Sequence, residues 1–266
     1  MLILLPPSEG KTPATAGDPV NHAGLWLPEL TTARKRVQTR LVALSKRTSP
    51  RAVAETLQVL GLTEGQRHEL TRNAAVPTAP AAPAADIYTG VLYEALDAHT
   101  LPPAARQWLD RTAVVFSGLW GAVRLTDRIP AYRLAVGVTL PPPVGGVTAH
   151  WKRAMKPHLD RAAANRPVLD LRSGAYATMW TPPGPETATM RVLHERLVDG
   201  TPKRAVVSHF NKATKGRIVR ALAESAATQG SINDVVATLK DHGYTLEEQP
   251  APAGKPRQLD VIVHEL

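Results

Sequence analysis

The chain has 266 residues, of which 43% are hydrophobic, and it contains no cysteine. A chain of this length buries roughly 70–75% of its unfolded surface, so it needs no disulfide or metal staple, and the lack of cysteine excludes Cys nucleophiles, thiolate zinc sites and iron–sulfur ligation. Lysine and arginine outnumber the acids by 32 to 23, and the resulting formal charge of +9 favours a polyanionic partner.

The N-terminus predicts a first strand and no targeting segment. Residues 1–5 are apolar, but two prolines and Glu9 follow at once, which leaves no basic region, no long apolar region and no cleavage site. No stretch approaches the roughly 20 apolar residues that span a bilayer. We therefore expect a soluble, cytoplasmic protein without a membrane partner.

The hydrophobic pattern predicts a mixture of strands and helices. The expected strands are residues 1–5, 113–117, 136–140, 168–171, 190–197, 204–210, 244–249 and 258–265. The expected helices are residues 31–47, 51–60, 64–72, 104–111, 150–165, 214–227 and 232–242. Turn signals at Asp199-Gly200 and at 250–255 predict antiparallel hairpins. We expect one α/β (mixed α+β) domain over residues 1–266, with a mixed central sheet flanked by helices and a Pro/Ala loop at 77–85.

The loop after the first strand is the first candidate for a ligand site. It reads Pro6-Pro7-Ser8-Glu9-Gly10-Lys11-Thr12, a bend with backbone N–H groups and a lysine that suit a phosphate. A P-loop is excluded because Leu5 stands where the first glycine is required. The alternative is an ordinary turn with an exposed lysine.

A glycine turn between two predicted helices is the second candidate. Leu60-Gly61-Leu62 is followed by Thr63 and Gln66 at the spacing of a capping box. Within a helical subregion at 31–76, this pattern is typical of a helix–hairpin–helix, whose backbone amides contact a DNA phosphate. An ordinary helical hairpin with glycine at its end is the alternative.

The third candidate is the Gly-rich end of a predicted strand. The run 116–124 leads through Asp127 to Tyr132 and Arg133. Arg124 and Arg133 are suited to grip a phosphate, and Tyr132 or Trp120 to stack on a base. Trp120 as a core residue, with Asp127 paired to an arginine, is the alternative.

The fourth candidate is the run 208–217, where a predicted strand passes into a helix. Lys212, Lys215 and Arg217 lie near the predicted first turn, where the helix dipole disfavours cations, and Gly216 adds a local cost within the helix. Two local costs at one place indicate an anion site. Solvated lysines on an exposed face are the alternative.

The histidines have no metal-ligand spacing, and no G-x-S-x-G elbow is present, so we expect neither a metal nor another cofactor.

Read together, these segments resemble the YaaA family of peroxide stress proteins. The resemblance rests on the ordered set of Leu5 to Lys11, Asp86-Ile87-Tyr88-Thr89-Gly90, Ser117-Gly118-Leu119-Trp120-Gly121, Pro130-Ala131-Tyr132-Arg133, Leu171-Arg172-Ser173-Gly174-Ala175-Tyr176 and Asn211 to Gly216. It implies a YaaA-like α/β fold, a role in the peroxide stress response that limits free iron, and a helix–hairpin–helix-bearing, positively charged cleft that binds DNA.

Two functional hypotheses follow, together with the set of residues expected to carry them. In the first, DNA lies in the cleft; in the second, an enzyme acts on a nucleotide or damaged nucleobase in a pocket at the strand ends, with Asp127 as base and Lys11 as electrophile or imine-forming amine. The expected ligand residues are Ser8, Lys11, Tyr88, Ser117, Arg124, Tyr132, Arg133, Ser173, Lys212, Lys215 and Arg217.

Overall fold

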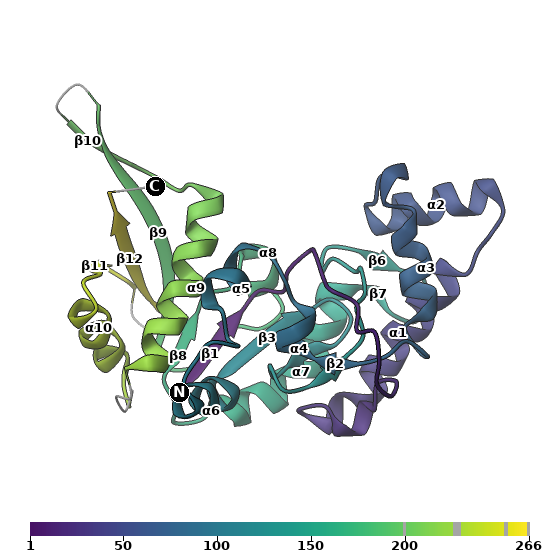
Figure 1. The fold of residues 1–266 in the computed structure, drawn as a ribbon, viewed down its shortest axis with the longest axis horizontal. Coiled ribbons are helices and arrows are strands. Elements are labelled where there is room, and N and C mark those ends of the chain that lie inside the picture. Colours follow the sequence, from purple (N-terminus) through teal and green to yellow (C-terminus); the bar gives the residue numbers. More distant parts are fainter. Residues whose placement is uncertain (199–200, 226–229, 253–254, 265–266) are drawn as a thin grey trace.

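A mixed β-sheet forms the centre of the computed structural model, which describes residues 1–198, 201–225, 230–252 and 255–264 (Figure 1). Its strand order is β11-β12-β9-β8-β1-β3-β4, and β10 pairs with β9 off this path. The strands are β1 (Leu2–Leu5), β3 (Ala113–Ser117), β4 (Gly121–Val123), β8 (Val168–Asp170), β9 (Thr187–Val198), β10 (Thr201–Ala205), β11 (Thr245–Gln249) and β12 (Arg257–Val263).

The middle of the sheet is parallel and its margins are antiparallel, which confirms the expected mixed sheet. β1 pairs in parallel with β3 and with β8, and the parallel run continues through β9 to β12. Every residue of β1, β3 and β8 is buried. Parallel strands covered on both faces read as continuous apolar runs, which is why the sequence shows them clearly.

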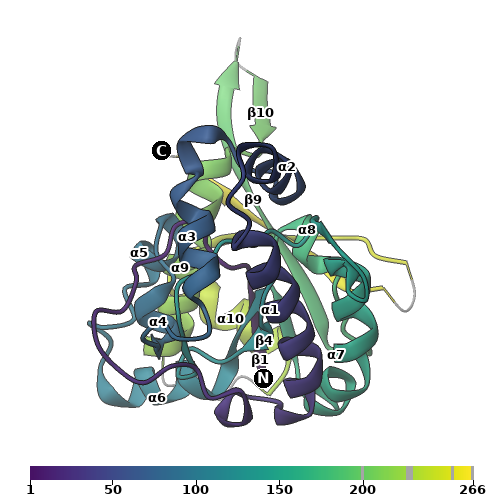
Figure 2. The ribbon, with the colours of Figure 1, turned by 90° about the vertical axis from the view of Figure 1, so that its right-hand side faces the viewer.

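Helices flank this sheet and lie beyond one of its margins. They are α1 (Thr31–Ser45), α2 (Pro50–Leu60), α3 (His68–Ala75), α4 (Ala84–Ile87), α5 (Val91–Leu96), α6 (Pro103–Thr112), α7 (Val147–Ala163), α8 (Gly174–Ala177), α9 (Ser208–Glu224) and α10 (Ile232–Asp241). Short 3₁₀ turns are η1 (His22–Gly24), η2 (Pro28–Leu30) and η3 (Glu64–Gln66). Figure 1 shows α10 with β11 and β12 at one end of the molecule and α1 to α3 at the other. Figure 2 shows α1 beside α7, and the two helices are in contact.

Two of the predicted strands differ from the structure. Within residues 136–140 only β6 (Thr139–Leu140) is a strand, and it pairs with β7 (Gly145–Gly146) outside the central sheet. Within 204–210 the strand β10 ends at Ala205, and α9 begins at Ser208. A short apolar run does not distinguish a strand from the first turn of a buried helix, and this ambiguity caused the second error.

Both predicted hairpins are present as antiparallel pairs. β10 pairs with β9, and β11 pairs with β12. The turn residues Asp199 and Gly200, and residues 253–254 of the second turn, lie outside the described residues, as does Glu265 at the end of the last predicted strand.

The segment 31–85 contains the predicted helices and more order than its proline content indicates. α2 ends at Gly61, whose φ of 65° is left-handed, and the Thr63 N–H donates to Gln66 Oε1 at 3.0 Å in a capping box. Within 77–85, β2 (Ala82–Pro83) pairs with β5 (Arg128–Ile129), and α4 begins at Ala84. In the described part of the chain, no helix is long and apolar enough to cross a membrane.

Candidate functional site

The carboxyl ends of β1, β3 and β8 lie side by side and bring remote loops together. Leu5 pairs with Val115, and Leu4 with Asp170, so the three strands end at the same edge of the sheet. The loop 6–12 follows β1, Ser117 is the last residue of β3, and Ser173 follows β8. Ligands favour this edge of a parallel sheet, because the loops there diverge and leave space.

Lys11 is anchored at this edge beneath the loop that precedes it. Its Nζ donates to the Ser8 carbonyl oxygen at 2.6 Å and lies 4.4 Å from the centre of the Tyr132 ring and 5.5 Å from that of Tyr88. Burial lowers the pKa of Lys11 to about 7, with the charge of Arg133 lowering it further and that of Glu9 opposing the shift. A substantial fraction of this amine is therefore neutral at physiological pH.

A chain of buried hydroxyls lies next to Lys11. The Ser117 and Tyr132 hydroxyls are 2.6 Å apart, and those of Tyr132 and Tyr88 are 3.0 Å apart. Burial raises the pKa of Tyr132 well above its usual value, so the phenol stays protonated. The backbone N–H of Trp120 donates to Ser117 Oγ at 2.9 Å, which fixes one end of the chain. Trp120 itself is fully buried, as the core alternative requires.

The side chains of Ser8 and Arg133 form hydrogen bonds that stabilise the loop 6–12. Ser8 Oγ accepts the Thr89 N–H at 3.0 Å and donates to the Gly10 carbonyl at 2.5 Å. Arg133 forms an ion pair with Glu9 at 2.5 Å and also donates to the Glu9 carbonyl at 3.1 Å. The carboxylate of Glu9 therefore neutralises the charge of Arg133 within the protein.

A cavity of about 430 Å³ opens between this loop, α5, the segment after β8, and the first turns of α9. Its lining includes the predicted residues Ser8, Ser173, Lys212 and Lys215. Because α9 begins at Ser208, Lys212 and Lys215 are three residues apart on one helix and share a face. Lys215 Nζ donates to the Leu171 carbonyl at 3.1 Å, and burial lowers the pKa of Lys215. Two cations therefore border one cavity.

The structure places three of the predicted residues elsewhere. β4 runs antiparallel to β3 and carries the chain back, so Arg124 donates to the Ala113 carbonyl at 3.1 Å, at the opposite edge of the sheet. The Asp127 carboxylate accepts the backbone N–H groups of Trp26 and Arg124 at 3.0 and 2.9 Å, and so brackets two loops. Arg217 is exposed on α9, outside the cavity lining. These three residues do not converge with Lys11.

Tyr93 and Asn211 are among the cavity-lining residues that were not expected from the sequence. Tyr93, on α5, donates its hydroxyl to the Pro6 carbonyl at 2.7 Å. Asn211 lies in the first turn of α9, four residues before Lys215. The sequence predicts the start of this helix at residue 214. If the predicted helix began at Ser208, Asn211 and Lys215 would be expected on the same helix face.

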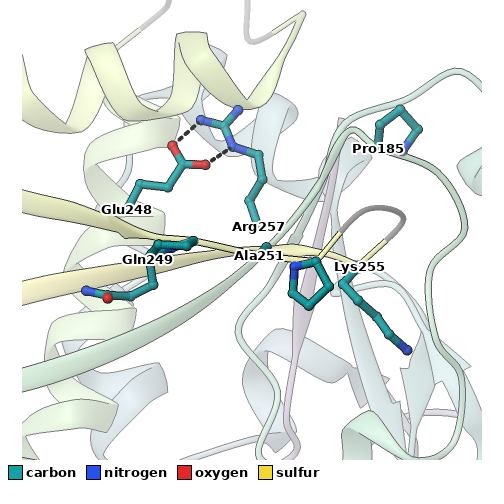
Figure 3. A pocket seen from close by; sticks show the side chains of 8 residues that line it. Pro185, Glu248, Gln249, Ala251, Lys255 and Arg257 are labelled. Carbon is teal, nitrogen blue, oxygen red and sulfur yellow. Dashed lines mark hydrogen bonds and ion pairs between the residues drawn. The ribbon is translucent and has the colours of Figure 1, made fainter.

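A second hollow, of about 490 Å³, lies beside the ends of β11 and β12, far along the sheet from Lys11 (Figure 3). Its charged lining is largely self-neutralised, because Arg257 binds Glu248 through two hydrogen bonds of 2.7 Å. Arg257 also donates to Asn233 at 2.8 Å. The third charged residue of the lining, Lys255, stands outside this ion pair.

Metal ligands do not gather at either place. Across the described ranges, no group of three or more His, Asp or Glu side chains is arranged to hold a metal ion.

These features define an α/β protein with a lysine-bordered cavity at the carboxyl edge of its parallel strands. The chain belongs to the family described as peroxide stress protein YaaA, whose model matches residues 1–250. A UPF0246 protein of Streptomyces coelicolor is 50% identical over 270 residues, which cover 100% of both chains. A UPF0246 protein of Corynebacterium efficiens is 43% identical, covering 93% of this chain and 95% of the relative. An uncharacterized protein of Campylobacter jejuni is 27% identical over 81% of this chain and 82% of its own length.

Proposed function

We propose that this peroxide stress protein binds DNA through a positively charged cleft centred on the cavity between β1, β8 and α9. The observation that carries the proposal is the pair Lys212 and Lys215 on one face of α9. In the part of the chain that the structure describes, neither lysine forms an ion pair with an acid, while the nearby Asp170 is engaged by Arg172. Cations without a direct ion pair beside the first turns of a long helix favour a phosphate.

The turn between α2 and α3 is the proposed second contact. Gly61, Thr63 and Gly65 are exposed there, and the capping box orients the N–H groups at the start of η3. In the proposed helix–hairpin–helix these groups bind a backbone phosphate without reading sequence. Such contacts would position a DNA duplex while the cavity binds one of its nucleotides.

Replacing both lysines by alanine is expected to weaken DNA binding and to flatten its salt dependence. Each phosphate contact contributes about 0.9 to the slope of log K against log salt, so the Lys212→Ala/Lys215→Ala variant should lose about 1.8 from that slope. Fluorescence anisotropy with a labelled duplex across a salt series measures both quantities.

Lys240→Ala is the matched control, since it removes an exposed lysine from α10, away from the cavity. Its salt slope should equal that of the unmodified protein. The DNA proposal fails if the unmodified protein binds with an affinity that salt does not change, or if the double variant keeps the full slope.

Lys11 supports a second candidate function, an enzyme acting on a nucleotide or damaged nucleobase. Its amine lies directly behind the loop that lines the cavity and is held in place by Ser8. A desolvated lysine is a competent nucleophile toward a carbonyl carbon: the amine adds to an aldehyde, loses water and forms an imine. A base-free deoxyribose in DNA carries such an aldehyde in its open form.

Borohydride is expected to trap this imine, because it reduces the C=N bond to a stable secondary amine. Since only the neutral amine reacts, and the pKa of Lys11 is about 7, the trapped fraction should rise between pH 6 and pH 8. Denaturing gel analysis of the protein with abasic DNA measures it. Lys11→Arg should abolish trapping and Lys240→Ala should not; equal trapping by Lys11→Arg would exclude this role.

A further inference from the structure

Asn211 lines the cavity, and its side chain carries a hydrogen-bonding group that is unused. Its Oδ1 is buried and has no hydrogen-bond partner. Buried polar groups are nearly always paired, and an unpaired one costs about 1–3 kcal/mol. The Asn211 backbone is fixed, because its N–H donates to the Val207 carbonyl at 2.9 Å. The side-chain amide can therefore rotate about the Cβ–Cγ bond without breaking a hydrogen bond of Oδ1.

Part of the cavity wall is aromatic, and its rings are held by contacts within the protein. Tyr93 lines it, with one ring face stacked on Tyr88 at a centroid distance of 5.5 Å and its hydroxyl bound to Pro6. Tyr176 also lines it and is only 9% exposed. Fixed aromatic rings lose little entropy when a flat ligand packs on them.

The cavity thus combines aromatic walls, two cations and an amide within about 430 Å³, a volume in the range of small-ligand sites. These groups match three features of a nucleotide, namely the face of its base, the edge of its base and its phosphate. A base packs on tyrosine, a phosphate is bound by lysine, and an amide pairs in bidentate fashion with an amino group beside a ring nitrogen, as asparagine does with adenine.

We infer that the cavity binds an adenine nucleotide unit, with Asn211 recognising the edge of the base and Lys212 and Lys215 binding the phosphate. This inference rests on the proposed phosphate-binding function and adds the identity of the base. The unit is either a free nucleotide or one extruded from DNA, since both present the same base edge and phosphate.

Isothermal titration with adenosine monophosphate and inosine monophosphate tests the inference without a variant. Inosine carries an oxygen in place of the adenine amino group, so it loses the donor to Asn211 Oδ1. The adenine nucleotide should bind about tenfold more tightly, the discrimination expected of one good bidentate pair. Equal affinities would overturn the inference.

Asn211→Leu should remove the preference while leaving the affinity for ribose 5-phosphate unchanged, because the lysines remain. A preference that survives in Asn211→Leu would also overturn the role of Asn211. Ribose 5-phosphate separates the two proposals. Binding that depends on Lys212 and Lys215 but not on the base sustains the phosphate site alone, whereas failure of ribose 5-phosphate to bind removes the phosphate site itself. Titration of the unmodified protein with a single-stranded oligomer of deoxyadenosine, against one of deoxyinosine, shows whether DNA supplies the unit.

Discussion

Alanine at position 216 is expected to lower the free energy of unfolding by about 3 kcal/mol, at the upper end of the range for overpacking. A Cβ on Gly216 would lie 2.2 Å from the Leu92 carbonyl oxygen and 2.9 Å from the Ala95 Cβ. Both contacts belong to α5, which packs against α9. Alanine favours a helix over glycine by about 1 kcal/mol, but a clash with backbone outweighs this gain. Urea unfolding followed by circular dichroism measures the change.

Gly137→Ala is the matched control. No atom lies within 4 Å of a Cβ at this position, so the variant should stay within about 0.5 kcal/mol of the unmodified protein. If Gly216→Ala were as stable as Gly137→Ala, the close approach of α5 and α9 would not be a determinant of the fold. Because residues of both helices line the cavity, Gly216→Ala should also weaken the proposed nucleotide binding.

Gly216 is a residue for which the sequence and the structure indicate different roles. In the sequence, a glycine within a predicted helix together with nearby lysines indicates an anion site. The structure gives this glycine a packing role against Leu92. That role was not visible in the sequence, because the partner helix α5 was not among the predicted elements. Lys212 and Lys215 border the cavity independently of this glycine.

The core of the sheet can be predicted because each of its strands is a continuous apolar run in the sequence. β1, β3 and β8 are short apolar runs in which every residue is buried, as expected of parallel strands covered on both faces. β4 was missed because it is short and begins at Gly121, whose φ is 76°. Its strand character comes from pairing with β3, which is a tertiary contact and leaves no periodic signal.

The same reversal at Gly121 explains which candidate residues come together. Ser117 ends β3 at the edge that also carries Lys11, and a continuous loop would have kept Arg124 and Asp127 nearby. Instead β4 runs antiparallel to β3, so Arg124 lies beside Ala113 at the start of β3, at the opposite edge of the sheet. The polar residues can be identified in the sequence. The direction of β4 decides which of them lie near the cavity, and it places Asp127 away from it.

Arg172→Met is expected to destabilise the protein by about 3–5 kcal/mol, because it leaves the carboxylate of Asp170 buried without its partner. The Arg172 side chain is 0% exposed and that of Asp170 is 6% exposed, and they are joined by hydrogen bonds of 2.8 and 2.6 Å. Arg172 also donates to the carbonyls of Tyr176 and Trp180 at 3.1 and 2.7 Å. Thermal and urea unfolding of the variant measure the loss.

Two comparisons isolate the cause. Arg257→Met breaks the partly exposed pair with Glu248 and should cost about 1 kcal/mol or less. Adding Asp170→Asn to Arg172→Met removes the stranded charge and should recover part of the loss; no recovery would show that the lost carbonyl contacts dominate instead. Between these two charged residues lies Leu171, whose carbonyl accepts Lys215. The buried pair therefore fixes the backbone that orients a cavity lysine, and the recovered double variant should bind ribose 5-phosphate better than Arg172→Met alone.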